Sequence, residues 1–270
     1  MTTDGPDLEQ VTKRQRVAWA AGDFNRVALS IMELAEQLVG AADPAPGTAV
    51  LDVACGSGNV ALVAARRWCA VTGLDFAPQL LESARVRAAA EGTEITWIEG
   101  DAQALPFEDA SFDTVTSCIG AMFAPDQERV ASELLRVCRP GGRIAMANWT
   151  PGSVAAAMFG ALAPFVPPPP GLAPPWRWGT VEGLQELLGP GADVAVETRV
   201  VYQRFPSREF MIGLFREFFG PITMAYQAVG PDRADELTAA LAVPIAEFDR
   251  AGDGTLKMEC ECLEVVATRR

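Results

Sequence analysis

The chain has 270 residues, of which 49% are hydrophobic and 21% are charged, so it can bury a substantial core as a globular protein. Its 22 basic and 35 acidic residues give a formal net charge of −13, which argues against binding to nucleic acid or to an anionic membrane surface. A polar, acidic N-terminus and the lack of a long apolar run predict a cytoplasmic protein that does not span a membrane.

The first 150 residues alternate between helical and strand patterns. Two helices are expected before the core, at about 8–21 and 24–39. Strands are then predicted at about 50–53, 70–75, 95–98, 112–118 and 143–149, separated by helices at 60–68, from Pro78 onwards and at 127–137. Arg139-Pro140-Gly141-Gly142 is expected to form the stop after the last of these helices. Strands joined by helices of this length predict right-handed crossovers and a parallel sheet.

The second half of the chain follows a different pattern. Alternation from Val194 to Gln203 predicts a strand near a sheet edge with one wetter face, on which Gln203 lies. A last strand is predicted at 256–268. The residues between these strands have helical spacing, with a break expected at Pro244, and are predicted to form a cap.

Seven prolines lie between Pro164 and Pro175, and such a tract must be extended. It could be a ligand for a recognition module. We favour a stiff connection that carries Trp176 and Trp178 across the mouth of a pocket.

The six cysteines are predicted to be reduced core residues, because disulfide frameworks belong to small secreted chains. The chain has no histidine, and Cys260 and Cys262 alone do not complete a tetrahedral zinc site. No metal site is therefore predicted.

The most informative segment is V-L-D-V-A-C-G-S-G-N, from Val50 to Asn59. An apolar strand that leads into a glycine turn lets the backbone approach a ligand at the N-terminus of the next helix. The turn formally satisfies the dinucleotide pattern G-x-G-x-x-A, and Asp75 follows at the distance of a ribose-binding carboxylate. A nucleotide-type ligand is predicted, and a dinucleotide remains an alternative.

Further motifs follow in a fixed order. They are G-L-D-F-A-P around Asp75, G-D-A-Q-A-L-P-F from Gly100, and L-R-V-C-R-P-G-G from Leu135. The ordered set resembles the class I methyltransferases that use S-adenosylmethionine (SAM), in the branch of ubiquinone and menaquinone biosynthesis, the methyltransferase type 11 domain. The resemblance covers about residues 50–150. W-A-A-G-D-F from Trp19 and N-W-T-P from Asn148 also resemble a bacterial subgroup of these enzymes.

The resemblance implies an α/β fold with a Rossmann-like, mostly parallel seven-stranded sheet and helices on both faces. We expect a single methyltransferase domain over 1–270. It would comprise N-terminal helices at 8–40, a SAM-binding core at 48–150, a proline-rich connection and helix at 151–190, and a helical cap at 206–252 inserted before the last strand.

The resemblance also assigns the cofactor site residue by residue. Asp52 would lie near the methionine ammonium, Asp75 would accept the ribose hydroxyls, and Asp101 would accept the adenine amine. The complete implied set is Asp52, Ala54, Gly56, Gly58, Asp75, Phe76, Asp101, Ala102, Cys118 and Ile119. Taken singly, Asp52 could be a solvated strand-end acid, Asp101 a helix cap and Phe76 a core residue.

Methyl transfer from a sulfonium needs mainly in-line placement of the nucleophile. The histidine base that many O-methyltransferases use is excluded here, because the chain has none. Weak candidates for another base are Asp23, Asp126, Tyr202, Glu217 and Tyr226. The acceptor pocket is predicted to use Trp19, Phe24, Met122, Phe123, Trp149, Phe159, Trp176, Phe215, Phe219 and Tyr226, although half or more of these could be the core of the cap.

These features predict a methyltransferase for a small, largely apolar or aromatic acceptor, with S-adenosylhomocysteine (SAH) as product. One alternative is a SAM-binding protein without transfer activity, which would act as a binder or as a rearrangement catalyst. A nicotinamide-dependent oxidoreductase is less favoured, because neither Tyr202 nor Tyr226 has a lysine four residues later. The sequence does not determine the acceptor atom or the oligomeric state.

Overall fold

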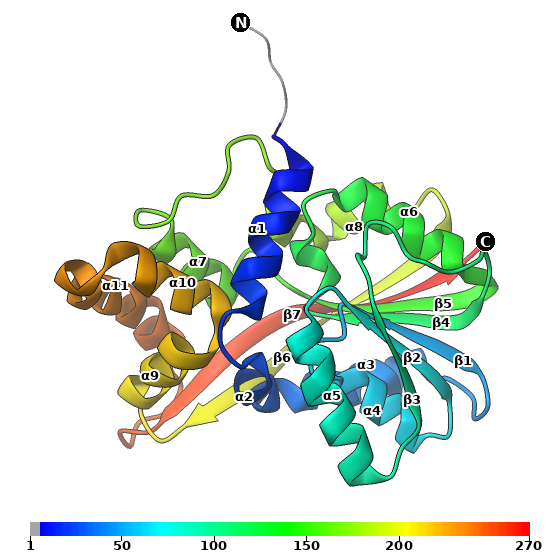
Figure 1. Cartoon of the computed structure of the whole chain (residues 1–270), viewed down its shortest axis with the longest axis horizontal. Helices are drawn as coiled ribbons and strands as arrows, with labels where there is room; N and C mark the ends of the chain where they lie inside the picture. The colour runs from blue at the N-terminus through cyan, green and yellow to red at the C-terminus, as the bar shows by residue number, and fades with distance from the viewer. Residues whose placement is uncertain (1–5) are drawn as a thin grey trace, which may run out of the picture.

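A seven-stranded sheet with the order β3-β2-β1-β4-β5-β7-β6 forms the centre of the protein (Figure 1). The structure is a computed structural model that describes residues 6–270. The strands are β1 (Ala49–Val53), β2 (Ala70–Asp75), β3 (Ile95–Glu99), β4 (Phe112–Cys118), β5 (Cys138–Trp149), β6 (Ala192–Phe205) and β7 (Leu256–Arg269). Neighbouring strands from β3 to β5 pair in parallel, and β7 lies antiparallel between β5 and β6. The predicted fold class is confirmed.

Helices cover both faces of this sheet, as a mostly parallel sheet requires. One face packs against α3 (Met32–Ala42), α4 (Asn59–Arg66) and α5 (Pro78–Glu91). The other packs against α6 (Gln127–Val137), the short helix η3 (Pro175–Gly179) and α8 (Val181–Leu187). The strands in the middle of the sheet are therefore apolar on both sides: Val50, Leu51 and Val53 of β1 are fully buried.

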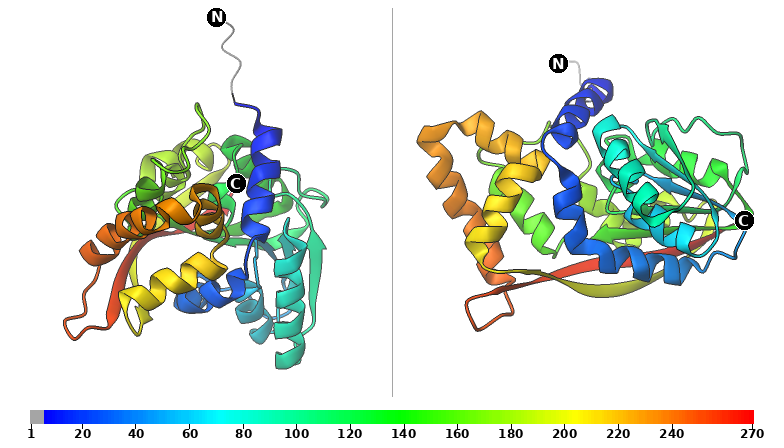
Figure 2. Two further views of the ribbon diagram at one scale, coloured as in Figure 1. Left: turned by 60° about the vertical axis from the view of Figure 1, so that its left-hand side comes forward. Right: turned by 60° about the horizontal axis from the view of Figure 1, so that its bottom comes forward.

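The remaining helices gather at one end of the sheet. The segment between β6 and β7 forms a cap of three helices, α9 (Arg208–Phe218), α10 (Gly220–Val229) and α11 (Ala234–Glu247), and includes the one-turn helix η4 (Pro231–Arg233). Helix α7 (Val154–Leu162) packs against α11. Figure 2 shows α1 (Leu8–Ala20) and α2 (Phe24–Ala28) between the cap and the rest of the sheet. No helix within residues 6–270 has the length and apolarity needed to cross a bilayer.

The N-terminal helices and the cap approach each other closely. A side-chain carbon at Gly220 would lie 1.9 Å from the carbonyl oxygen of Ala18 in α1. Gly22, whose φ of 92° favours glycine, would bring such a carbon within 2.8 Å of the carbonyl oxygen of Phe218. These contacts join α1, α2 and the cap into one covering layer.

Three predicted boundaries are wrong. The expected helix at 24–39 is divided into α2, the short helix η1 (Leu29–Ile31) and α3, because the Ser30 hydroxyl donates to the Val27 carbonyl at 2.7 Å and competes with helical bonding. Pro244 does not break α11, since it lies close to the end of the helix and its own carbonyl still accepts from Phe248. Helix α6 ends at Val137 as predicted, but the fifth strand begins at Cys138 and not at 143, so Arg139–Gly142 form a bulge inside β5, where Gly141 has a φ of 76°.

The prediction that Gln203 lies on the wetter face of β6 is also wrong. Its inward row at the C-terminal end is Val201, Gln203 and Phe205, which are all buried, whereas Tyr202 is on the opposite face. The reason is that α8 also packs against β6, whereas near the end of the strand Gln203 bonds to Ser30 of η1 and Phe205 packs against Phe215 of α9. A strand covered on different faces at its two ends does not keep one apolar face.

All six cysteines are free thiols. Five are buried and Cys118 is half-buried. Burial raises the pKa of Cys138 to about 11, and those of Cys260 and Cys262 to about 12, so these thiols are neutral at physiological pH.

Candidate functional site

A cavity of about 1000 Å³, open on one side, lies at the carboxyl ends of β1, β2 and β4 and beneath α1. This is the edge at which open α/β sheets bind ligands. The residues predicted for the cofactor meet here: Asp52, Ala54, Gly56, Asp75, Phe76, Asp101, Ala102, Cys118 and Ile119 all line the cavity. Four segments separated in sequence are therefore brought together at one wall.

Gly58 is the exception among the predicted cofactor residues. It has a φ of 85° and forms the N-cap of α4, and a side-chain carbon there would lie 2.7 Å from the ring of Trp97. The glycine is required for packing against Trp97, and Gly58 does not line the cavity. The neighbouring Ser57 and Asn59 line the cavity instead.

Asp52 is a buried carboxylate in the floor of the cavity, with 1% of its surface exposed. It accepts hydrogen bonds from the backbone N–H of Ala61 at 3.1 Å and from the Thr116 hydroxyl at 3.2 Å. Burial raises its pKa to about 7, and these two bonds only partly offset that effect. It is not the solvated strand-end acid of the alternative interpretation, and a cationic ligand group would stabilise its ionised form.

Asp75 is held in place by the backbone on both sides. Its Oδ2 accepts from the Gly56 N–H at 2.8 Å and its Oδ1 from the Ala77 N–H at 2.9 Å. The side chain is 4% exposed, and burial raises its pKa. Each oxygen keeps a second lone pair for a ligand hydroxyl.

The loop after β3 and helix α1 form the roof of the cavity. Asp101 accepts from the backbone and side-chain amides of Gln103 in a tight turn, so it is not a helix cap. Gln103 also donates to Thr12 of α1 at 3.1 Å, and Gln15 donates to the Phe123 carbonyl at 2.8 Å. Thr12, Gln15 and Gln103 line the cavity. Gln103 belongs to the motif that begins at Gly100 but was not assigned to the site, and Thr12 and Gln15 had no signal in the sequence.

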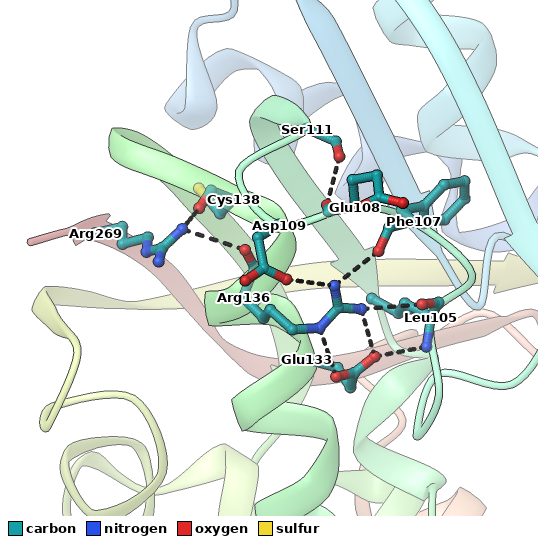
Figure 3. A network of polar contacts seen from close by, with 9 residues as sticks. All are labelled: Leu105, Phe107, Glu108, Asp109, Ser111, Glu133, Arg136, Cys138 and Arg269. Atoms are coloured by element: carbon teal, nitrogen blue, oxygen red, sulfur yellow. Dashed lines mark hydrogen bonds and ion pairs between the residues drawn. The ribbon is translucent and has the colours of Figure 1, made fainter.

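The rest of this loop is clamped by α6, as Figure 3 shows. Arg136 binds both oxygens of Glu133 at 2.8 Å and donates to the carbonyls of Leu105 and Phe107 at 2.9 and 2.7 Å. Glu133 in turn accepts from the Leu105 N–H at 2.7 Å. The clamp fixes the chain four residues after Asp101, so it supports the cofactor-side loop from behind.

A second cavity of about 650 Å³ adjoins the first one under the cap. Five residues line both cavities: Trp19, Phe24, Ile31, Ile119 and Phe123. The rest of the wall is almost wholly apolar and comes from α2, β5, α7, β6, α9, α10 and β7; it consists of Val27, Trp149, Val154, Ala155, Met158, Phe159, Leu162, Gln203, Phe215, Phe219, Ile222, Met258 and Cys260.

An aromatic cluster forms the junction of the two cavities. The ring centroids of Trp19 and Phe24 lie 5.6 Å apart at 90°, and Trp19 lies 5.2 Å from Phe123 and 5.6 Å from Phe219. Edge-to-face pairs of this kind add about 0.5–1.5 kcal/mol each beyond area burial. The cluster joins α1, α2, η2 (Ala121–Phe123) and the cap around the passage between the cavities.

Seven of the ten predicted acceptor residues line the second cavity: Trp19, Phe24, Phe123, Trp149, Phe159, Phe215 and Phe219. The other three predictions are corrected. Met122 is fully buried in the core, and Trp176 packs behind Phe123 and Phe159 without lining the cavity. Tyr226 bonds to Thr238 at 2.8 Å between α10 and α11. Trp178, expected at a pocket mouth, is also fully buried.

None of the five candidate bases lines either cavity. Asp23 and Asp126 cap the N-termini of α2 and α6, where their side chains accept backbone N–H groups. Tyr202 is on the outer face of β6 beside Lys257 and Glu259, Glu217 is exposed on α9, and Tyr226 is held as described above. In each case the side chain lies outside both cavities, so the structure does not support its assignment as a base.

The residues of the second cavity that sequence reasoning missed include three on β6 and β7: Gln203, Met258 and Cys260. They lie side by side because β6 pairs with β7 in the register Gln203 to Met258 and Val201 to Cys260. The signal in the sequence is a glutamine between Val201 and Phe205, at an inward position of an alternating strand.

Comparison with known proteins shows which family this chain resembles. A profile described as "Methyltransferase domain" matches residues 50–142. The uncharacterized protein Rv1405c of Mycobacterium tuberculosis is 38% identical, and the match covers 100% of both chains. Demethylmenaquinone methyltransferase of Thermus thermophilus is 40% identical over 43% of this chain and 57% of its own length. The YcgJ protein of Bacillus subtilis has a similar fold, with a TM-score of 0.60, 17% identity, and coverage of 88% of this chain and 99% of that one.

Proposed function

Because this chain belongs to the class I SAM-dependent methyltransferases, related to the quinone biosynthesis branch, we propose that it methylates a small, largely apolar or aromatic molecule. The observation that carries the proposal is the pair of adjoining cavities. One has buried carboxylates at the strand ends, and the other has apolar and aromatic walls. A macromolecular acceptor is disfavoured, because α1 and the cap cover the second cavity.

The residues of the first cavity fit SAM. We assign Asp52 to the methionine ammonium and Asp75 to the ribose hydroxyls, and Phe76, Asp101 and Ala102 to the adenine. The burial of Asp52 supports this assignment, because a buried carboxylate with a raised pKa is stabilised by a cationic partner. The two N–H groups that hold Asp75 support it as well, since they fix the orientation of its remaining lone pairs.

Bound SAM supplies a methyl group on a sulfonium, which is already activated for transfer to a nucleophile. The chain's own contribution would be to place the acceptor in line at the aromatic passage formed by Trp19, Phe24 and Phe123, and to exclude water from it. No carboxylate or phenol of the described residues lines the second cavity. We therefore propose transfer without a side-chain base, to a nucleophile that needs none.

The acceptor's identity does not follow from the relatives. The family profile ends at residue 142, whereas most of the wall of the second cavity comes from residues beyond it. The quinone substrate in the name of the Thermus relative is for this reason only a first compound to test.

Binding and transfer need separate experiments. Isothermal titration should give saturable binding of SAH and none of NADH; the reverse result would favour the oxidoreductase interpretation. Incubation with deuteriomethyl SAM and a metabolite extract of the source cells should then give a labelled small molecule. SAH binding with no labelled product in extract, and none with demethylmenaquinone, would instead favour a SAM-binding protein without transfer activity. Labelling only of RNA or protein would contradict the small-molecule proposal.

A further inference from the structure

Among residues 6–270, Gln203 is the only side-chain amide in the wall of the second cavity, and it is 6% exposed. The other polar side-chain atoms of that wall, among residues 6–270, are the Cys260 thiol and the indole nitrogens of Trp19 and Trp149; no charged side chain lines it. An amide buried in an apolar cavity costs free energy unless its hydrogen bonds are made. Its bonding therefore indicates what the cavity is built to hold.

The orientation of the amide is fixed by its neighbours. The Ser30 hydroxyl donates to the Val27 carbonyl at 2.7 Å, so its oxygen can only accept from Gln203, whose Nε2 lies 2.7 Å away. On the other side, Oε1 of Gln203 lies 3.7 Å from the Cys260 thiol, whose single proton can be donated either to it or to the Met258 carbonyl at 3.5 Å. The nitrogen therefore faces η1 and the oxygen faces β7.

Half of the amide's hydrogen-bonding capacity is left over. A side-chain amide has two N–H donors and two acceptor lone pairs, and the contacts above use one donor and at most one lone pair. The second N–H and the second lone pair have no partner within the described protein, and the side chain that carries them lines the cavity. A ligand group that accepts or donates one hydrogen bond would complete them.

The charge of the cavity wall limits the ligand further. An ionised group placed there would have no counter-charge, and burying an unpaired ion costs several kcal/mol. The aromatic rings of Trp19, Phe24 and Phe219 offer flat apolar contacts instead.

We propose that the acceptor is a neutral, flat ring system with a hydroxyl or carbonyl group, and that Gln203 selects it by hydrogen bonding to that group. This inference rests on the proposed function, because it assigns the second cavity to the methyl acceptor. Gln203 is a specificity-determining residue in this view, and its amide positions the ring with respect to the aromatic passage.

The test uses two probes of nearly equal shape, 2-naphthol and 2-methylnaphthalene, with the full-length protein saturated with SAH. Equilibrium dialysis should show that the protein binds 2-naphthol about three- to tenfold more tightly, the range expected for one neutral hydrogen bond. Gln203→Met keeps the length of the side chain and removes the amide. It should abolish this preference by weakening 2-naphthol binding alone.

Gln127→Met is the matched control. Gln127 is a second buried amide, on α6, which donates to the carbonyls of Ala173 and Pro174 and lines neither cavity. This variant should keep the preference for 2-naphthol, even if its melting temperature falls as much as that of Gln203→Met.

Three outcomes would overturn the inference. They are equal affinity of the wild-type protein for both probes, a preference that persists in Gln203→Met, and no binding of either probe. The last result would mean that the cavity does not accept flat rings. Binding of SAH is measured separately. Its absence would refute the proposed function, and the same two probes, dialysed against the protein without SAH, would still decide the role of Gln203.

Discussion

Replacing Asp75 by asparagine tests the centre of the cofactor site. Both carboxylate oxygens accept backbone N–H groups, from Gly56 at 2.8 Å and from Ala77 at 2.9 Å. In Asp75→Asn the new NH₂ group must face one of these donors, so at least one bond to a charged acceptor is lost. The expected loss of folding stability is about 1.5–3 kcal/mol.

The effect on SAH binding should be larger. If Asp75 accepts both ribose hydroxyls, the variant loses two bonds to a charged acceptor, or about 3 kcal/mol or more in binding. This corresponds to a dissociation constant raised by roughly a hundredfold or more. Isothermal titration with SAH measures the affinity, and urea denaturation measures the stability of the free protein.

Asp113→Asn separates the two effects. Asp113 also holds a strand in place, since it accepts the Ala49 N–H at 2.7 Å, but it lines neither cavity. This variant should lose stability and keep its affinity for SAH. An Asp75→Asn protein that is folded and binds SAH within about threefold of wild type would refute the assignment of Asp75 to the ribose.

Three further predictions concern charge, the covering layer and the clamp. Burial raises the pKa of Asp52 from 3.8 to about 7, so the Asp52 carboxyl binds its proton more tightly in the folded protein than in the unfolded chain. The free energy of unfolding should therefore fall as the pH rises from about 4 to 7. Urea titrations at several pH values should show that this free energy depends less on pH in Asp52→Asn. Gly220→Ala places a carbon 1.9 Å from a carbonyl oxygen of α1 and should destabilise by about 1–3 kcal/mol in urea, whereas Gly213→Ala, with nothing within 4 Å, should stabilise by about 0.5–1 kcal/mol. Arg136→Met should lower the melting temperature and cost about 3 kcal/mol of folding stability, because it breaks a pair with the buried carboxylate of Glu133. Arg85→Met removes an exposed ion pair and should cost less than about 1 kcal/mol. Equal effects of the two arginine variants would contradict the role of the clamp.

The comparison of sequence and structure is most instructive along β6. Residue alternation predicted the strand correctly, but it placed Gln203 on a wet face; Tyr202, a candidate base, lies on the opposite, outer face. Which face of a strand is buried depends on what packs against it, and here η1 and α9 cover the C-terminal end of the strand from one side. That information lies in segments far away in the sequence.

The same distinction holds for the candidate catalytic residues. Asp23 and Asp126 lie in regions that cover the cavities, but each side chain accepts a backbone N–H at a helix start. A local cap of this kind can be read from sequence only when the helix boundary is known to within one residue.

The sequence by itself determined the family and the order of strands and helices. It also predicted ten cofactor-side residues, nine of which line the first cavity. It could do so because these residues follow strand ends in a fixed order, and parallel strands bring their carboxyl ends to one edge of the sheet. Only the tertiary structure decided the shape of the second cavity, including the place of Gln203 and the lack of a charged group among the described residues of its wall. Its walls come from α1, α2, β5, β6, β7, α7 and the cap, and packing between segments so distant in sequence leaves no local pattern.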